Sequence, residues 1–256
     1  MLTTRYQKVD TLTVQDVMRM HALFEANYAN SPLQTFISDL NKKDGAFIVR
    51  HRKTQEIVGF STLGIYEFEL NGRKAKGLFS GDTIVEKQYW GTRSLQRAAI
   101  TKMVWEAFKN PFKMQYWLLI SKGYKTYLLM TRNFHDYYPR RGEHNADMQA
   151  MVEQYCEAMF PGKLDRERMV LDFGENANCL MDHVAGITPE LRADADIAFF
   201  EQRNPGWERG NELPCIARAD ALACVQIMAR FVKKMVFGSG KKRIAEPGRE
   251  GVRQVA

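Results

Sequence analysis

Residues 78–99, LFSGDTIVEKQYWGTRSLQRAA, decide the fold. The first half is apolar and β-branched and predicts a strand, Gly91 marks a turn, and the second half opens a helix. From Thr92 to Asn110 apolar residues fall on one broad helical face, and Pro111 ends it. A strand that passes through a glycine turn into a helix leaves backbone N–H groups free at the helix start, where they can bind phosphate.

Upstream of this stretch the sequence predicts two helices and three antiparallel strands. The first helix begins near Val14 after the capping residue Thr13, and the second begins at Leu33 after Ser31-Pro32. The strands cover residues 46–51, 57–70 and 73–85 and are rich in β-branched and aromatic residues. Asn71-Gly72 predicts a tight hairpin turn between the last two, because such turns need positive φ.

Downstream, strands and helices alternate. The apolar run MQYWLLI at 114–120 predicts a strand buried on both faces. Helices are predicted near 125–134, 146–159 and 219–235, and strands at 196–202 and 213–217. Between 160 and 194 the periodicity is weak.

The composition favours one globular domain of residues 1–237 in the cytoplasm. The chain has 256 residues, 45% hydrophobic and 26% charged, without an apolar run long enough to cross a membrane. Residues 1–10 are mixed and polar, so we expect no secretory signal. The four cysteines lie far apart with no CxxC pair, which argues against a disulfide framework and a metal site.

The net charge of +7 is concentrated near the C-terminus. From Lys233 onward seven basic and two acidic residues give +5, which leaves +2 for the rest. Residues 238–256 are rich in glycine and basic residues with few apolar anchors, so we predict a solvated, disordered tail and no nucleic-acid partner.

The order of these elements resembles the GCN5-related N-acetyltransferase (GNAT) superfamily. The resemblance covers residues 14–140 and, after a helical insertion at about 142–195, residues 196–217. It implies an α+β fold with a central mixed, mostly antiparallel sheet flanked by helices. The family motif Arg/Gln-x-x-Gly-x-Gly/Ala is matched by Gln88 and Gly91, with Arg93 at its last position. The implied cofactor-binding residues are Val85, Gln88, Gly91, Thr92, Arg93, Ser94 and Leu95.

The resemblance also implies an N-acyltransferase that moves an acyl group from acetyl-CoA, or another acyl thioester, to an amine. The donor can also be the phosphopantetheine of an acyl carrier protein, and the acceptor a small molecule or a peptide. Asp82 and Glu86 are the candidate bases, and we prefer Asp82 because a strand residue can lie in a buried cleft where its pKa rises. Tyr137 and Tyr138, with Tyr127 as a further option, are the candidate acids.

Two alternatives stay open from the sequence. The chain can be a GNAT-shaped binding module without activity, or a peripheral membrane protein whose basic tail contacts anionic lipid. His135 and Asp136 are adjacent, and we interpret them as a surface pair.

Overall fold

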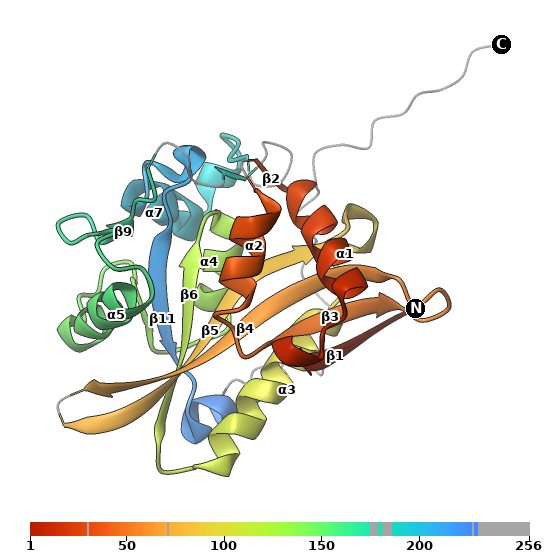
Figure 1. Cartoon of the computed structure of the whole chain (residues 1–256). Helices are drawn as coiled ribbons and strands as arrows, with labels where there is room; N and C mark the ends of the chain where they lie inside the picture. The colour runs from red at the N-terminus through yellow and green to blue at the C-terminus, as the bar shows by residue number, and fades with distance from the viewer. Residues whose placement is uncertain (30, 71, 175–178, 181–185, 227, 230–256) are drawn as a thin grey trace.

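A seven-stranded sheet organises the chain (Figure 1). The computed structural model describes residues 1–256 except 30, 71, 175–178, 181–185, 227 and 230–256. The strand order is β1-β3-β4-β5-β6-β11-β7, and every neighbouring pair is antiparallel except β5 and β6. The strands are β1 (Leu2–Lys8), β3 (Gly45–His51), β4 (Ile57–Leu70), β5 (Arg73–Val85), β6 (Met114–Ser121), β7 (Tyr137–Tyr138) and β11 (Leu213–Arg218).

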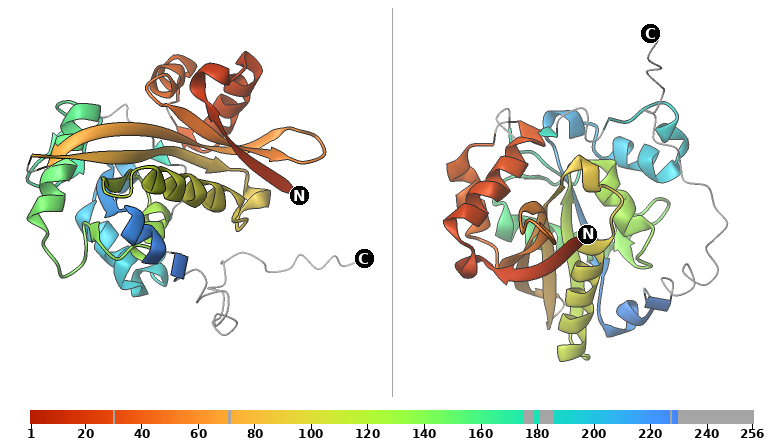
Figure 2. Two further views of the ribbon diagram at one scale, coloured as in Figure 1. Left: turned by 90° about the horizontal axis from the view of Figure 1, so that it is seen from below. Right: turned by 90° about the vertical axis from the view of Figure 1, so that its right-hand side faces the viewer.

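Helices cover both faces of this sheet (Figure 2). One face packs against α3 (Ser94–Lys109), α4 (Tyr124–Thr131) and α7 (Ala195–Arg203). The other face packs against α1 (Val14–Glu25) and α2 (Leu33–Leu40) at one end and α5 (Ala146–Met159) at the other. The sheet is therefore the middle layer of three, and its apolar side chains form the core on both sides.

The helix starts follow the capping signals of the sequence. Thr13 caps α1: its side chain accepts a hydrogen bond from Asp16 N at 3.1 Å, and the Asp16 carboxylate accepts one from Thr13 N at 3.2 Å. This reciprocal pair satisfies N–H groups that the first helical turn leaves free. The predicted cap at Thr13 is confirmed.

The parallel pair β5–β6 is short, and its end positions the candidate site. It runs from Ala75 opposite Met114 to Ser80 opposite Leu119. β5 continues beyond that point against β4 alone, to the pair Gly59 and Val85. The two strands therefore separate after Ser80, while β5 stays anchored on its other edge.

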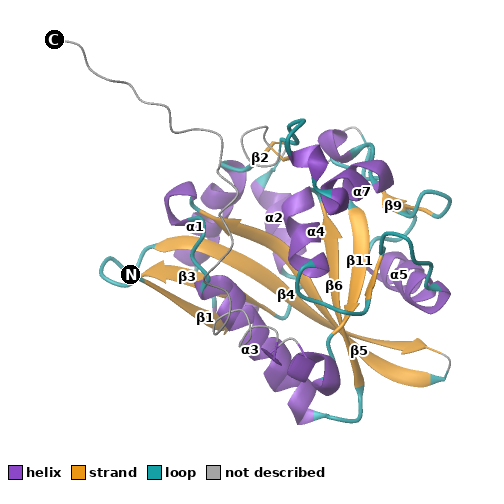
Figure 3. Cartoon of the chain, turned by 180° about the vertical axis from the view of Figure 1, so that it is seen from behind, coloured by secondary structure: helices purple, strands orange, loops and turns teal. Residues whose placement is uncertain are grey.

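Short elements complete the chain (Figure 3). Two small antiparallel pairs lie outside the main sheet, β2 (Tyr28–Ala29) with β10 (Cys179–Leu180) and β8 (Leu164–Asp165) with β9 (Val170–Leu171). Single 3-10 turns occur at Val9–Thr11, Lys87–Tyr89, Leu191–Ala193 and Trp207–Arg209. Among the described residues, no helix is long and apolar enough to span a membrane.

One predicted strand is wrong. Residues 196–202 lie in helix α7, whose start is capped by the Asp194 side chain accepting from Asp196 N at 2.9 Å. Ile197 and Phe200 are buried at helical spacing, and the adjacent aromatic residue Phe199 made the stretch resemble a buried strand.

The other predicted elements agree with the structure where it describes them. β11 confirms the strand predicted at 213–217, and the helices predicted at 125–134 and 146–159 correspond to α4 and α5. The last helix is present at 221–226, 228 and 229, and the rest of its predicted length lies outside the described residues. The same holds for Asn71 of the predicted hairpin turn and for the tail 238–256. Strand β1 was not predicted.

Candidate functional site

A cluster of ionisable side chains lies where β5 and β6 separate. Asp82 is on β5, Lys122 follows the last residue of β6, and Glu212 precedes the first residue of β11. Lys43, from the turn before β3, and Tyr28 of β2 reach the same cluster, because both interact electrostatically with Asp82. Five positions spread over most of the chain thus meet at one end of the sheet.

The distances within this cluster show a partly paired arrangement. Lys122 Nζ lies 3.3 Å from Glu212 Oε1 and 5.2 Å from the centroid of the Tyr28 ring. Lys43 Nζ lies 4.9 Å from the centroid of the Phe79 ring. Among the described residues, the Asp82 carboxylate has no ion pair or hydrogen bond with another side chain. Glu212 is thus paired with Lys122, whereas Asp82 has no such pair within the described ranges.

Burial dominates the electrostatics of the cluster. It raises the pKa of Asp82, against the opposing charges of Lys122 and Lys43. It likewise raises the pKa of Glu212, although Lys122 opposes it, and lowers the pKa of Lys43. Burial and then the charges of Asp82 and Glu212 raise the pKa of the Tyr28 phenol, which stays protonated. A carboxylate with a raised pKa is a better proton acceptor near neutral pH.

A β-bulge aims Asp82 into this cluster. Gly81 and Asp82 together oppose the single residue Thr62 of β4. A Cβ atom on Gly81 would lie 2.2 Å from Thr62 Oγ1, so any larger residue at this position would force the Thr62 side chain to move. Thr62 Oγ1 is buried and has no hydrogen-bond partner among the described residues. Gly81 therefore suits the bulge, which interrupts the alternation of side chains along β5 at Asp82.

After β5 the chain makes the predicted glycine turn into α3. Gly91 has a φ of 83°, in the region that favours glycine. Arg93 is the N-cap residue of α3, and its side chain makes no capping hydrogen bond, so within the part of the chain that the structure describes the first N–H groups of the helix have no side-chain partner. Arg93 and Arg97 are exposed and form no ion pair with another described residue. The turn presents N–H groups and positive charge together.

The side chain of Trp90 folds back onto this turn and forms a hydrogen bond with the end of β5. Its Nε1 donates to the Val85 carbonyl oxygen at 2.7 Å, and Lys125 Nζ of α4 lies 4.7 Å from the centroid of its ring system. The Val85 carbonyl is therefore already engaged. A ligand that formed a hydrogen bond with the Val85 carbonyl oxygen would have to displace the Trp90 indole.

The remaining predicted donor-site residues differ in exposure. Thr92 is exposed, as are Gly91 and Arg93, whereas Leu95 is buried in the core. Gln88 Nε2 donates to Glu86 Oε2 at 2.8 Å, and the Ser94 hydroxyl accepts from Thr4 Oγ1 of β1 at 3.1 Å.

Glu86, the second candidate base, is held in an ion pair. Arg19 of α1 contacts it at 2.5 Å and also contacts Glu56 at 2.9 Å. Gln88 occupies its other carboxylate oxygen. The two carboxylates thus differ: Glu86 is engaged by Arg19 and Gln88, whereas Asp82 has no ion pair or side-chain hydrogen bond within the described residues.

The structure does not bring the predicted acids Tyr137 and Tyr138 to Asp82. Both are on β7, which pairs with β11 and is separated from β5 by β11 and β6. The buried Tyr138 hydroxyl donates to Gln149 Oε1 at 3.3 Å, and Tyr127, also buried, donates to Pro139 O at 2.9 Å. A separate small pocket lies at this edge, lined by Asp136, Tyr137, Tyr138, Arg140, Glu143 and Asn145.

Four residues of the cluster were not predicted from the sequence. Lys122 and Glu212 are charged residues that directly border the apolar strands β6 and β11, and that position is a signal that could have been used. Tyr28 and Lys43 lie in short connections on either side of α2, where no local pattern distinguishes them.

Cysteine and metal chemistry receive no support from the described residues. Cys156, Cys215 and Cys224 are buried free thiols, and burial raises the pKa of each, which makes them poor nucleophiles. No group of three or more His, Cys, Asp or Glu side chains within the described ranges is arranged to hold a metal ion. His135 Nδ1 and Asp136 Oδ1 lie 3.0 Å apart, and both side chains are largely exposed.

No family model and no curated protein match the sequence. Solved structures do match. A probable N-acyltransferase from Enterococcus faecalis is 14% identical over 53% of this chain and 34% of its own, with a TM-score of 0.37. This chain therefore spans about a third of that protein. A GNAT-family N-acetyltransferase from Escherichia coli in complex with CoA is 9% identical over 53% of this chain and 70% of its own, at a TM-score of 0.38.

A third match is Arabidopsis thaliana NAA60 in complex with a bisubstrate analogue, 16% identical over 56% of this chain and 92% of its own, with a TM-score of 0.40. The predicted fold class, a central mixed, mostly antiparallel sheet flanked by helices, is confirmed. Within the main sheet the parallel pair is β5 with β6, and the other neighbouring strands are antiparallel. At these low identities and TM-scores, function has to be judged from the residues of this chain.

Proposed function

We propose that this protein is an acyltransferase that moves an acyl group from an acyl thioester to an amine. The observation that carries the proposal is the position of Asp82: a half-buried carboxylate with a raised pKa, on a bulge where β5 and β6 separate. Strands that separate in this way leave backbone N–H and C=O groups without strand partners, and these can bind an extended ligand.

In the proposed reaction, Asp82 acts on the acceptor. An amine reaches the site as an ammonium ion and must lose a proton before its nitrogen lone pair can attack the thioester carbonyl. Asp82 takes that proton, directly or through one water molecule. The new C–N bond then forms and the C–S bond breaks. The nitrogen loses its second proton, which passes to the departing thiolate, so that the products are an amide and a free thiol. The protonated Tyr28 hydroxyl is the proposed hydrogen-bond donor to the acceptor or to the departing sulfur.

The donor's phosphate groups fit the turn from Val85 to the start of α3. Backbone N–H groups in the first turn of α3 and the guanidinium groups of Arg93 and Arg97 would supply hydrogen bonds and positive charge. Both CoA and the phosphopantetheine of an acyl carrier protein carry phosphate joined to a pantetheine thiol. We propose this class of donor, with a small-molecule or peptide amine as the acceptor and no metal ion.

A second candidate function is a binding module that has lost catalysis. The observation in its favour is Trp90, whose indole engages the Val85 carbonyl at the place where a pantetheine arm would run. If the indole stays in place, a donor could bind through its phosphate groups alone, without bringing its thioester to Asp82.

Calorimetric titration with CoA, acetyl-CoA and a phosphopantetheinylated carrier protein tests the proposal. We expect at least one of the three to bind, and its affinity to fall in Arg93→Ala. Release of free thiol from an acyl thioester in the presence of an amine panel then separates the two functions. Binding without thiol release favours the inactive module, and absence of binding by all three donors contradicts both.

A further inference from the structure

Helix α3 exposes aromatic side chains at its C-terminal end. Its buried face includes Met103, Glu106 and Ala107, so the opposite face meets solvent. On that face Trp105 is 62% exposed and Phe108 is 51% exposed, and Phe112 in the loop to β6 is 101% exposed. We call these three residues the aromatic tip. Single exposed apolar residues are common on soluble proteins, whereas three large exposed aromatic residues within eight positions are unusual.

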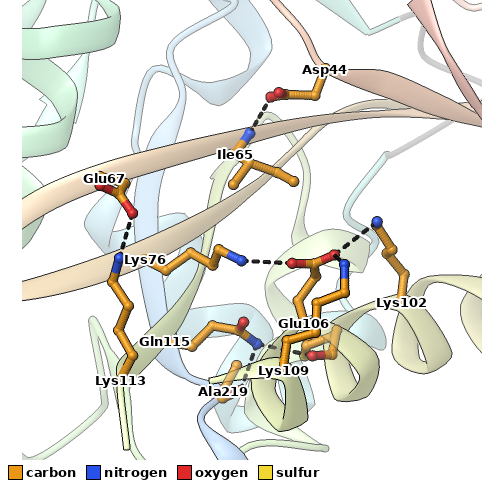
Figure 4. Close-up of polar contacts among 11 residues, drawn as sticks. Asp44, Ile65, Glu67, Lys76, Lys102, Glu106, Lys109, Lys113, Gln115 and Ala219 are labelled. Carbon is orange, nitrogen blue, oxygen red and sulfur yellow. Dashed lines mark hydrogen bonds and ion pairs between the residues drawn. The ribbon is translucent and has the colours of Figure 1, made fainter. Parts of the chain in front are cut away.

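Two lysines adjoin the aromatic tip, Lys109 near Trp105 and Lys113 directly after Phe112, and Figure 4 shows the glutamates with which they pair. Lys76, Lys102 and Lys109 contact the single carboxylate of Glu106 at 2.6, 3.0 and 3.1 Å. Lys113, the residue after Phe112, pairs with Glu67. Four lysines against two glutamates leave this region with a net charge of +2. Lys109 Nζ also lies 5.8 Å from the centroid of the Trp105 ring system, so charge and aromatic surface are adjacent.

The tip also projects from the body of the protein. Figures 1 and 3 show the C-terminal end of α3 and the following loop at the lower margin of the molecule. A convex end of this kind can enter the headgroup region of a bilayer, which needs no complementary cavity. Trp and Phe with adjacent lysines is the composition of segments that lie in a membrane interface.

We propose that the aromatic tip docks the protein on an anionic lipid surface. The aromatic side chains enter the interfacial layer, and the neighbouring ammonium groups contact lipid phosphates. A protein partner is less well matched, because the charged residues beside the tip are lysines, in which protein interfaces are depleted. This surface also lies at the opposite end of α3 from the glycine turn. The helix has 16 residues, which separates the two by about 24 Å, so lipid and acyl donor would not compete.

Vesicle flotation with the full chain tests this docking. We expect binding to vesicles of phosphatidylcholine mixed with phosphatidylglycerol and little binding to phosphatidylcholine alone. Phe112→Ser should weaken binding about tenfold, since it removes one aromatic side chain from the interface. Its melting temperature should not change, because Phe112 is fully exposed. Phe108→Ser is the second variant, and Val14→Ser is the control, since Val14 is 79% exposed and lies on α1, across the sheet.

The lysines are tested by Lys109→Gln combined with Lys113→Gln, which should weaken vesicle binding more at low salt than at high salt. Three outcomes overturn the proposal. One is no binding to anionic vesicles. Another is anionic-vesicle binding that the Phe112, Phe108 and lysine variants all retain, which would assign the binding to the basic C-terminal tail. The third is self-association of the parent chain that Phe112→Ser abolishes, without vesicle binding, which would assign the tip to a second copy of the chain.

Discussion

Replacing Asp82 by Asn should stop acyl transfer while leaving the fold intact. Asn has nearly the same shape and can occupy the same bulge, but it cannot take a proton from an ammonium ion. Removing a positioned base typically costs a factor of about 10² to 10⁴ in rate, which corresponds to about 3 to 5 kcal/mol in the activation free energy. Asp82 has no ion pair or side-chain hydrogen bond with another described residue, so the substitution breaks no such contact.

The stability of this variant has a definite sign. Burial raises the pKa of Asp82 in the folded state, so the folded protein disfavours the carboxylate form. The free energy of unfolding therefore falls as the pH rises from the unfolded-state pKa of Asp82 to its higher folded-state pKa. Above the folded-state pKa the full destabilisation is present. Asp82→Asn removes this destabilisation. At neutral pH the free energy of unfolding should be unchanged or slightly higher.

The assay is thiol release from the acyl thioester that binds most tightly, with calorimetry to show that donor affinity is unchanged. Glu86→Gln is the matched control, because it also neutralises a carboxylate near the end of β5 but breaks an ion pair with Arg19. Glu86→Gln should retain activity at some cost in stability. The reasoning fails if Asp82→Asn keeps activity within a few-fold of the parent, or if Glu86→Gln alone abolishes it.

Three further changes test other parts of the account. Arg93→Ala should weaken donor binding by about 1.5 to 3 kcal/mol with little change in melting temperature, whereas the exposed control Arg141→Ala should not; equal affinity in the parent and Arg93→Ala would mean that backbone amides suffice. Tyr28→Phe should lower kcat and leave donor affinity unchanged, and Tyr138→Phe should stay near parental activity; the reverse pattern would return the acid role to β7. Glu106→Gln should lower the free energy of unfolding at pH 7 by about 3 kcal/mol. Burial alone would raise the pKa of Glu106, but the three lysines outweigh burial and lower this pKa from 4.5 to about 2. That contribution is complete above pH 4.5 and is lost as the pH falls toward 2, so denaturant unfolding at pH 7 and pH 3 should show a smaller difference at pH 3.

Local signals predicted the elements whose sequences carry them. The cap at Thr13, the glycine turn at Gly91 and the apolar run of β6 each depend on neighbours within a few residues, and the structure shows each of them. Helix α7 was predicted as a strand because two adjacent aromatic residues, Phe199 and Phe200, are compatible with a buried strand as well as with a half-buried helix. The capping residue Asp194 was the better signal. Strand β1 had β-prone residues at Thr3, Thr4 and Tyr6, but as an edge strand it carries too few apolar residues to stand out.

The candidate site was only partly predictable for a different reason. Asp82 follows from its place on the strand before the glycine turn. Its neighbours Lys43, Lys122 and Glu212 come from separate segments of the chain, and only the strand order of the sheet brings them together. The bulge at Gly81 and Asp82 is equally invisible locally, because it exists only relative to Thr62 on the neighbouring strand.

The central claim is that an acyl thioester binds along the end of β5 and at the start of α3, beside Asp82. Amide hydrogen exchange of the full chain, with and without acetyl-CoA at saturating concentration, tests it most directly. The account predicts new protection at residues 82–95, centred on the turn at Gly91, with no change at residues 136–145. Protection confined to 136–145, where Tyr137 and Tyr138 line the other pocket, would contradict it.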